Sequence, residues 1–145
     1  MSYIQARTLT ACVDGVAPSM GGLAPQYKLV KFHMGHAPLL LDEPNKTVQA
    51  LPLDTDIPAM QGVFYSKTLA PSDFQYSNGK LLVRCICPAD VLAEPQVYSV
   101  LYIEDSNGKL SHGVVKLPDT ILPETGAETW VYVEFPINTN VTPPV

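Results

Sequence analysis

The sequence predicts a single mostly β domain: a sandwich-like antiparallel sheet of about six strands, with one or two short helices and a long Pro-rich loop. Three observations support this fold class. Apolar and polar residues alternate over several short segments, which is typical of half-buried strands. Asn-Gly pairs stand between such segments, where a tight hairpin turn needs positive φ. The chain has 145 residues, which is one domain by length and enough to bury about 70% of the unfolded chain's surface.

The opening residues allow two structures. Between residues 3 and 16 the spacing of apolar residues fits an amphipathic helix loosely, and Asp14-Gly15 is its expected end. A short strand over residues 4–9 fits the same pattern, and the two alternatives stay open. Residues 18–25, PSMGGLAP, are expected to form a loop, because Pro and Gly interrupt regular structure.

Six later segments are predicted to be strands, because they are rich in β-branched and aromatic residues or alternate between apolar and polar ones. They are residues 27–33, 63–69, 81–87, 97–103, 113–117 and 130–137. In the last of them one face carries Val131, Val133, Phe135 and Ile137, and the other carries Trp130, Tyr132 and Glu134.

Two of the connections are predicted to be hairpin turns. Asn78-Gly79 precedes the strand at 81–87, and Asn107-Gly108 lies between the strands at 97–103 and 113–117. Asn107-Gly108 is the strongest hairpin signal in the chain. It is expected to form a type I′ turn, in which both central residues have positive φ.

The other connections are irregular. Residues 36–60 carry four prolines, too many for a regular helix, so this long stretch is expected to be a functional loop or an interface arm. One helical turn is expected over residues 89–94, and a loop over 118–129. Residues 138–145 have no core-forming residues and are expected to form an extended tail, outside the domain of residues 1–137.

The cysteines and the charge narrow the class of protein. The odd set Cys12, Cys85 and Cys87 argues against a complete disulfide framework and for a reducing compartment. Cys85 and Cys87 share one strand face and are expected to be small buried apolar residues. A net charge of −5 with scattered basic residues argues against a nucleic-acid partner. No secretory leader pattern and no window of ~20 apolar residues stand out, so no membrane partner is expected.

No group of residues assembles into a catalytic or metal-binding pattern. His33 and His36 are the only close histidine pair, and no Cys, Asp or Glu stands at a recognisable ligand spacing from them. Ordinary loop or interface histidines are therefore favoured over a metal site. The acidic pairs Asp42-Glu43 and Asp54-Thr55-Asp56 lie in the Pro-rich stretch and are expected to be solvated. We predict no enzyme activity, no metal and no cofactor.

The aromatic residues of the last strand have two interpretations. Trp130 and Tyr132 lie opposite the aliphatic row, so they are either enclosed within a sandwich or part of a subunit contact, where such residues are enriched. Glu134 on the same face argues against full enclosure. Together with apolar residues of the Pro-rich stretch and the tail, the candidate interface residues are Trp130, Tyr132, Pro38, Leu39, Leu40, Leu41, Val141, Pro143 and Pro144.

Three groups of residues carry a resemblance to a known family. Leu9-Thr10 with Gly15 resembles an opening L-T-x-x-G segment, and residues 28–35, KLVKFHMG, resemble a strand that ends in Gly. Residues 103–113, IEDSNGKLSHG, resemble an apolar strand followed by D-x-x-G-x-L and a further Gly. In this order they resemble the N-terminal, baseplate-attachment domain of bacteriophage tail-collar fibre proteins, over roughly residues 7–137. The chain departs from that family at Pro18 and Gly21-Gly22, where its members carry an Ala-rich helix.

The resemblance implies a virion structural protein, located in the tail and made in the cytoplasm of the host bacterium. It implies other tail, baseplate or fibre proteins as partners, and a homo-oligomer in which a trimer is favoured over a dimer. An attachment or adaptor role is expected, because no fibre shaft follows. Residues 36–60 and 138–145 are the expected arms. The alternative is a small β module that binds carbohydrate or peptide on aromatics such as Trp130, Tyr65 or Tyr76.

Overall fold

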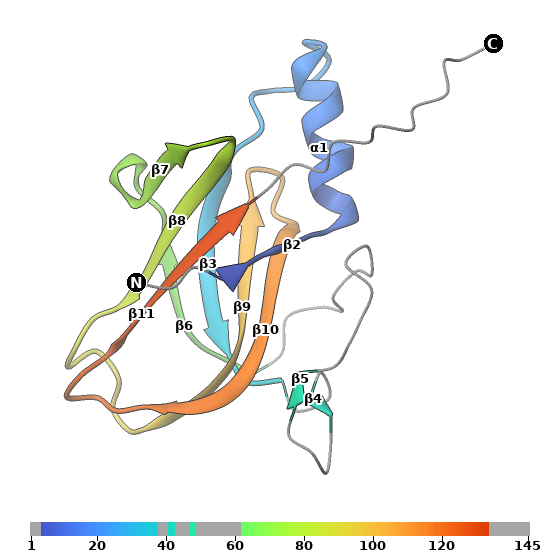
Figure 1. Ribbon diagram of the computed structural model, residues 1–145. Coiled ribbons are helices and arrows are strands. Elements are labelled where there is room, and N and C mark those ends of the chain that lie inside the picture. The colour runs from blue at the N-terminus through green and yellow to red at the C-terminus, as the bar shows by residue number, and fades with distance from the viewer. Residues whose placement is uncertain (1–3, 38–40, 43–46, 49–61, 134–145) are drawn as a thin grey trace.

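Two facing β-sheets, with one helix at one end, make up the part of the chain that a computed structural model describes, residues 4–37, 41–42, 47–48 and 62–133 (Figure 1). The four-stranded sheet has the order β1 (Ile4–Gln5), β11 (Ala127–Val133), β8 (Lys80–Cys87) and β7 (Phe74–Ser77). The five-stranded sheet has the order β2 (Arg7–Thr8), β10 (Leu110–Ile121), β9 (Gln96–Asp105), β3 (Leu29–Gly35) and β6 (Val63–Thr68). Strand β1 runs parallel to β11, and the other pairs are antiparallel. The predicted mostly β, sandwich-like fold is confirmed.

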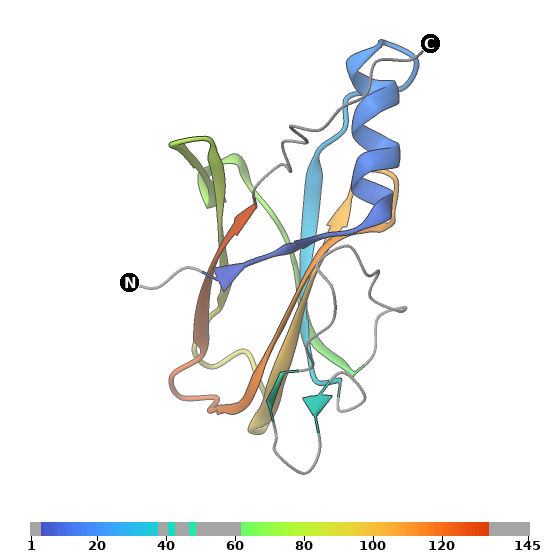
Figure 2. The same ribbon diagram turned by 45° about the vertical axis from the view of Figure 1, so that its right-hand side comes forward.

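The six predicted strands correspond to the six longest ones, β3, β6, β8, β9, β10 and β11. The further strands are only two to four residues long. Among them, β4 (Leu41–Asp42) and β5 (Thr47–Val48) form a small hairpin within the predicted Pro-rich loop. The helical elements are α1 (Thr10–Met20) and the 3-10 helix η2 (Pro71–Asp73). Figure 2 shows the two sheets as separate layers, with α1 at the upper end beside the five-stranded sheet.

The N-terminal segment contains both structures that its sequence allows. Strands β1 and β2 come first, and β1 joins one sheet while β2 joins the other. Between them the Ala6 N–H donates to the Tyr132 carbonyl at 3.0 Å, and after them the Leu9 N–H donates to the Ser111 carbonyl at 2.8 Å. The first residues therefore bridge the two layers of the sandwich before the helix begins.

Helix α1 is longer than expected. The predicted end at Asp14-Gly15 is wrong, because α1 continues to Met20 with Pro18 inside it. The loop predicted over 18–25 is confirmed for residues 21–25, which form turns and bends, but it begins three residues later than expected. Proline lacks an N–H and so leaves the carbonyl four residues earlier without its helical donor. That carbonyl belongs to Asp14, which is exposed and open to water. The helix then ends where the Gly21 N–H donates to the Ala17 carbonyl at 3.2 Å.

The two Asn-Gly turns differ in geometry. Asn78 and Gly79 both have positive φ, 52° and 78°, which suits a type I′ turn. At the second turn the hairpin is confirmed, but the predicted type I′ geometry is wrong, because only Gly108 has positive φ, 75°. The Asp105 carboxylate decides this turn: its Oδ1 accepts the backbone N–H groups of Asn107 and Lys109, each at 2.9 Å.

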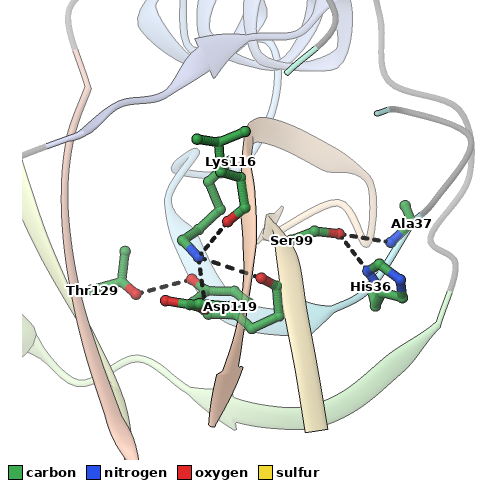
Figure 3. A network of polar contacts seen from close by, with 8 residues as sticks. His36, Ala37, Ser99, Lys116, Asp119 and Thr129 are labelled. Carbon is green, nitrogen blue, oxygen red and sulfur yellow. Dashed lines mark hydrogen bonds and ion pairs between the residues drawn. The ribbon is translucent and has the colours of Figure 1, made fainter. Parts of the chain in front are cut away.

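Strand β10 extends into the predicted loop over 118–129, and β11 begins before that loop ends, so only residues 122–126 connect the two strands. Strand β10 ends only at Ile121, and the register with β9 shifts between Val115 and Asp119, so Pro118 lies in a bulge where its missing N–H is tolerated. Lys116 of this bulge folds back over β9. Its Nζ donates to the carbonyls of Tyr98 at 3.3 Å and Leu117 at 3.1 Å and to the Asp119 carboxylate at 2.9 Å (Figure 3).

The helical turn predicted over residues 89–94 is also absent. This part of the chain forms turns and bends, and Asp90 has a φ of 68°, outside the helical region. The Asp90 N–H instead donates to the Pro123 carbonyl at 2.7 Å, which ties this connection to the loop after β10.

The core lies between the two sheets. Its fully buried side chains include Phe32, Met34, Val83, Leu101, Ile103, Val131 and Val133. Cys85 and Cys87 belong to it as free thiols, as predicted, and burial raises the pKa of Cys85 to about 12. The Tyr98 and Thr129 hydroxyls lie 2.9 Å apart and link β9 to β11 across the core (Figure 3). A second, smaller cluster of Leu9, Ala37, Val100 and Tyr102 is also buried.

Gly15 is required where α1 packs on Tyr27, because a Cβ at this position would overlap the Tyr27 ring. Alanine in place of glycine ordinarily stabilises a helix by about 1 kcal/mol. We expect Gly15→Ala instead to lower the free energy of unfolding by about 1–3 kcal/mol, as overpacked sites do. Urea denaturation followed by circular dichroism measures the change.

Gly21→Ala is the matched control, because a Cβ there would meet its nearest atoms only at 3.8 Å. We expect the free energy of unfolding to change by less than about 0.5 kcal/mol in this variant. Equal effects of the two substitutions would contradict the packing argument.

Candidate functional site

Trp130 and Tyr132 lie on the outer face of the four-stranded sheet, while Val131 and Val133 point into the core. Both aromatic side chains are half-buried. The Glu128 Oε1 atom accepts the Trp130 indole N–H at 2.7 Å and the Arg84 Nε–H at 2.8 Å. The Arg84 hydrogen bond holds the pKa of Glu128 below its usual value.

A positively charged side chain lies over each of the two aromatic rings. The Arg84 guanidinium lies 5.5 Å from the centre of the Trp130 ring, and the Lys80 ammonium lies 4.7 Å from that of Tyr132. The Tyr132 hydroxyl donates to Gln5 Oε1 at 3.4 Å. The outer face is thus a partly exposed, mixed aromatic and charged surface, and its role in a subunit contact stays a prediction.

The other predicted interface residues cannot be placed in the same way. Pro38, Leu39, Leu40, Val141, Pro143 and Pro144 lie outside the described residues. Leu41 belongs to β4, of which the backbone pairing with β5 is described.

His33 lies within β3 and His36 directly follows it, and the two histidines have separate hydrogen-bond partners. His33 Nδ1 lies 2.6 Å from the Ser66 hydroxyl, and its Nε2 lies 3.1 Å from the Glu104 carboxylate. His36 Nδ1 lies 2.8 Å from the Ser99 hydroxyl, which also accepts the Ala37 N–H (Figure 3). Within residues 4–37 and 62–133 and the short β4–β5 pair, no group of three His, Cys, Asp or Glu side chains is placed to hold a metal ion.

A partly open cavity of about 700 Å³ lies between α1 and the end of the sandwich nearest to it. Its wall is mostly apolar, and its apolar lining residues include Val16 and Met20 of α1, Leu29 of β3, Phe74 of β7, Leu81 of β8 and Val133 of β11. This cavity has no local signature in the sequence, because the lining residues are spread from residue 12 to residue 133.

Tyr27 and Asp105 form the main polar contact beside this cavity. The Tyr27 hydroxyl, on a lining residue, donates to Asp105 Oδ2 at 2.8 Å, while Oδ1 accepts the two N–H groups of the hairpin turn. The Asp105 side chain is therefore fully hydrogen-bonded although its residue is only 1% exposed. Burial, with the Asp105 hydrogen bond, raises the pKa of Tyr27, so the phenol stays protonated at neutral pH.

His112 of β10 also lines the cavity and is 1% exposed. Its Nδ1 lies 2.9 Å from the Ser111 hydroxyl, and that hydroxyl donates its single proton to the Ile103 carbonyl at 3.2 Å. The hydroxyl oxygen must then accept the Nδ1–H of the imidazole, and this assigns the tautomer in which Nε2 carries a lone pair. Nε2 has no hydrogen-bond partner.

Cys12 and His112, two of the titratable groups in the wall of the cavity, are both held in their neutral forms at pH 7. Cys12, the thiol in its wall, has a raised pKa because of burial, and a protonated thiol is a poor nucleophile. Burial lowers the pKa of His112 to about 4, against a partial opposing effect of Asp105, so the imidazole is neutral at pH 7. The wall is mostly apolar, its one charged residue, Lys28, is exposed to water, and it holds one unpartnered buried acceptor, which together favour a mostly apolar, uncharged ligand.

Comparison with known proteins gives no relative for this chain: no family model, no curated protein and no solved structure matches it. Among the helices that the structure describes, none has the length and apolar character that crossing a membrane requires.

The depressed pKa of His112 makes stability sensitive to acid. In the unfolded chain the imidazole has a pKa of 6.5, whereas in the folded chain it is about 4, so the unfolded state takes up the proton first as the pH falls. The contribution of neutral His112 is complete above the unfolded pKa and is lost as the pH falls toward the folded one, a change of about 3 kcal/mol.

His112→Leu removes this titration while the other titrating groups stay the same. We expect wild type to lose more unfolding free energy than the variant between about pH 7.5 and about pH 4.5, measured by urea denaturation. A parallel pH dependence of the two proteins would show that His112 is not held neutral by the fold.

Proposed function

We propose that this protein is a virion structural protein of a bacteriophage tail, an attachment or adaptor subunit that binds other tail, baseplate or fibre chains without catalysing a reaction. The order of sequence features from Leu9-Thr10 to Gly113, which resembles the baseplate-attachment domain of tail-collar fibre proteins, supports this proposal. The mostly β sandwich, with a helix between its second and third strands, is compatible with it.

Exposed apolar residues at the end of α1 and directly after it are the structural observation that supports the proposal most strongly. Met20 is 83% exposed and Leu23 is 86% exposed. Both views show this end of α1 projecting beyond the ends of the strands (Figures 1 and 2). Asp14 is the one charged residue between residues 10 and 26. Exposed apolar surface with little charge is typical of a protein contact site, and methionine is enriched in such sites.

The outer face of the four-stranded sheet supports a second contact. Trp130 and Tyr132 supply partly exposed aromatic surface, and Lys80, Arg84 and Glu128 surround it with charge. Aromatic side chains within a polar rim are typical of subunit interfaces. Two separate contact surfaces are what an adaptor between other subunits needs, and in a cyclic homo-oligomer, with a trimer favoured, one of them serves self-association.

Mass spectrometry of purified particles from the virus that encodes this chain tests the proposal. We expect the wild-type chain in the particle, and Met20→Glu with Leu23→Glu to reduce its incorporation about fivefold or more, because both side chains would carry charge into an apolar contact. Val91→Glu, at an exposed apolar residue away from α1, is the matched control and should incorporate normally. Absence of the wild-type chain from particles would reject the tail role.

The alternative is a small β module that binds carbohydrate or peptide. Tyr76 on β7 favours it, because the side chain is 75% exposed and its ring is free to stack on a sugar. A glycan array probed with wild type and with Tyr76→Ala distinguishes the two functions. Binding that the substitution abolishes would favour the module over the adaptor.

A further inference from the structure

The cavity beside α1 has the size and composition of a small-molecule site. Its volume of about 700 Å³ falls in the range of drug-sized ligand pockets, about 300–1,000 Å³. The wall combines apolar side chains from α1 and both sheets with a smaller set of polar residues: Ser19, Tyr27, Lys28, Thr68 and His112. A ligand here would therefore bury mostly apolar surface, and the few polar groups would decide which apolar molecules are preferred.

Most polar groups in the wall have partners of their own. The Tyr27 hydroxyl donates to Asp105 at 2.8 Å, and the Ser19 hydroxyl accepts the Tyr27 N–H at 2.9 Å. Lys28 and Thr68 are exposed to water. In the described part of the chain, Nε2 of His112 is the one buried side-chain nitrogen or oxygen without a hydrogen-bond partner.

The missing partner of His112 must be a donor. Because Ser111 gives its proton to the Ile103 carbonyl, it accepts the imidazole Nδ1–H, and Nε2 is left as a bare acceptor. A buried acceptor without a donor is a cost to the folded state, which a ligand relieves when it supplies the proton. His112 is only 1% exposed and is one of the residues that line the cavity, so the cavity is the side from which we expect a donor to reach Nε2.

We propose that this cavity binds a small neutral molecule with an apolar body and one hydrogen-bond donor, and that the donor O–H or N–H is directed to Nε2 of His112. An alkylphenol is the simplest molecule of this kind. A charge on the part of the ligand that lies against His112 is disfavoured, because the apolar wall there would remove water from the charge without replacing it, and Lys28, the one charged lining residue, is exposed to water. This site is independent of the proposed role in a phage tail.

A matched pair of probes tests the donor requirement on the full-length protein. The compound 4-propylphenol carries the donor, whereas 4-propylanisole has the same ring and chain with a methyl ether in its place. By isothermal titration calorimetry we expect the phenol to bind wild type about tenfold more tightly than the ether. In His112→Leu we expect both probes to bind with about equal affinity, because the acceptor is gone and the apolar wall remains.

A pair of variants on one helix locates the site. Val16 lines the cavity, whereas Val13 is 57% exposed and does not line it. Val16→Trp should fill the cavity and remove binding of both probes, and Val13→Trp should bind them as wild type does. Circular dichroism of each variant checks that the fold is retained.

Three results would overturn the proposal. Equal affinity of wild type for the phenol and the ether would show that His112 accepts no hydrogen bond from the ligand. Failure of wild type to bind either probe would reject the site, and loss of binding in Val13→Trp as well as Val16→Trp would place it elsewhere. If His112→Leu does not fold, NMR of the His112 imidazole decides: the Nε2 resonance must move with the phenol and not with the ether.

Discussion

The hydrogen bonds to the Asp105 carboxylate are the interactions on which the end of the sandwich beside α1 depends. A buried carboxylate is costly unless it is hydrogen-bonded, and Asp105 meets this condition with three donors from two parts of the chain. Two of them are backbone N–H groups of the hairpin turn after β9, and the third is the hydroxyl of Tyr27, two residues before β3. The carboxylate therefore fixes the ring of Tyr27, and that ring fixes how closely α1 can approach through Gly15.

The position of α1 in turn creates the cavity. The helix packs closely on Tyr27 at Gly15, and its Val16 and Met20 line the cavity. The same region contains the unpartnered Nε2 of His112. The cavity and the His112 imidazole thus lie at one end of the sandwich. The aromatic and charged residues of β8 and β11 lie on the outer face of the four-stranded sheet. The proposed contact surface at the end of α1 shares Met20 with the cavity, whereas the outer face of the four-stranded sheet is separate from both.

The sequence predicted the elements whose local pattern repeats and missed those that depend on tertiary contacts. The long strands were found because a half-buried strand alternates with a period of two residues. Strands β1, β2 and β7 are too short for that pattern to show. Pro18 and Pro118 were taken as ends, but an exposed carbonyl and a bulge make proline tolerable at each.

The candidate site shows the same limit. Trp130 and Tyr132 were placed correctly on one face of the last strand, because strand parity is a local property. The cavity could not be predicted, since its walls come from residues far apart in the chain. His112 stood out in no motif, and its significance arises only from the proton that Ser111 gives to Ile103.

The crossing of residues 4–9 between the two sheets has a mechanical consequence. Strand β1 pairs with the edge of β11 in one sheet, and β2 pairs with the edge of β10 in the other, so the short segment of residues 4–9 covers an edge of both sheets. Proteolytic loss of this segment would expose the edges of β11 and β10 together. Each edge would have unpaired backbone N–H and C=O groups that can pair with a strand from another molecule. The trimmed protein would then be prone to strand exchange and fibre growth, which makes the integrity of the first residues a matter of solubility.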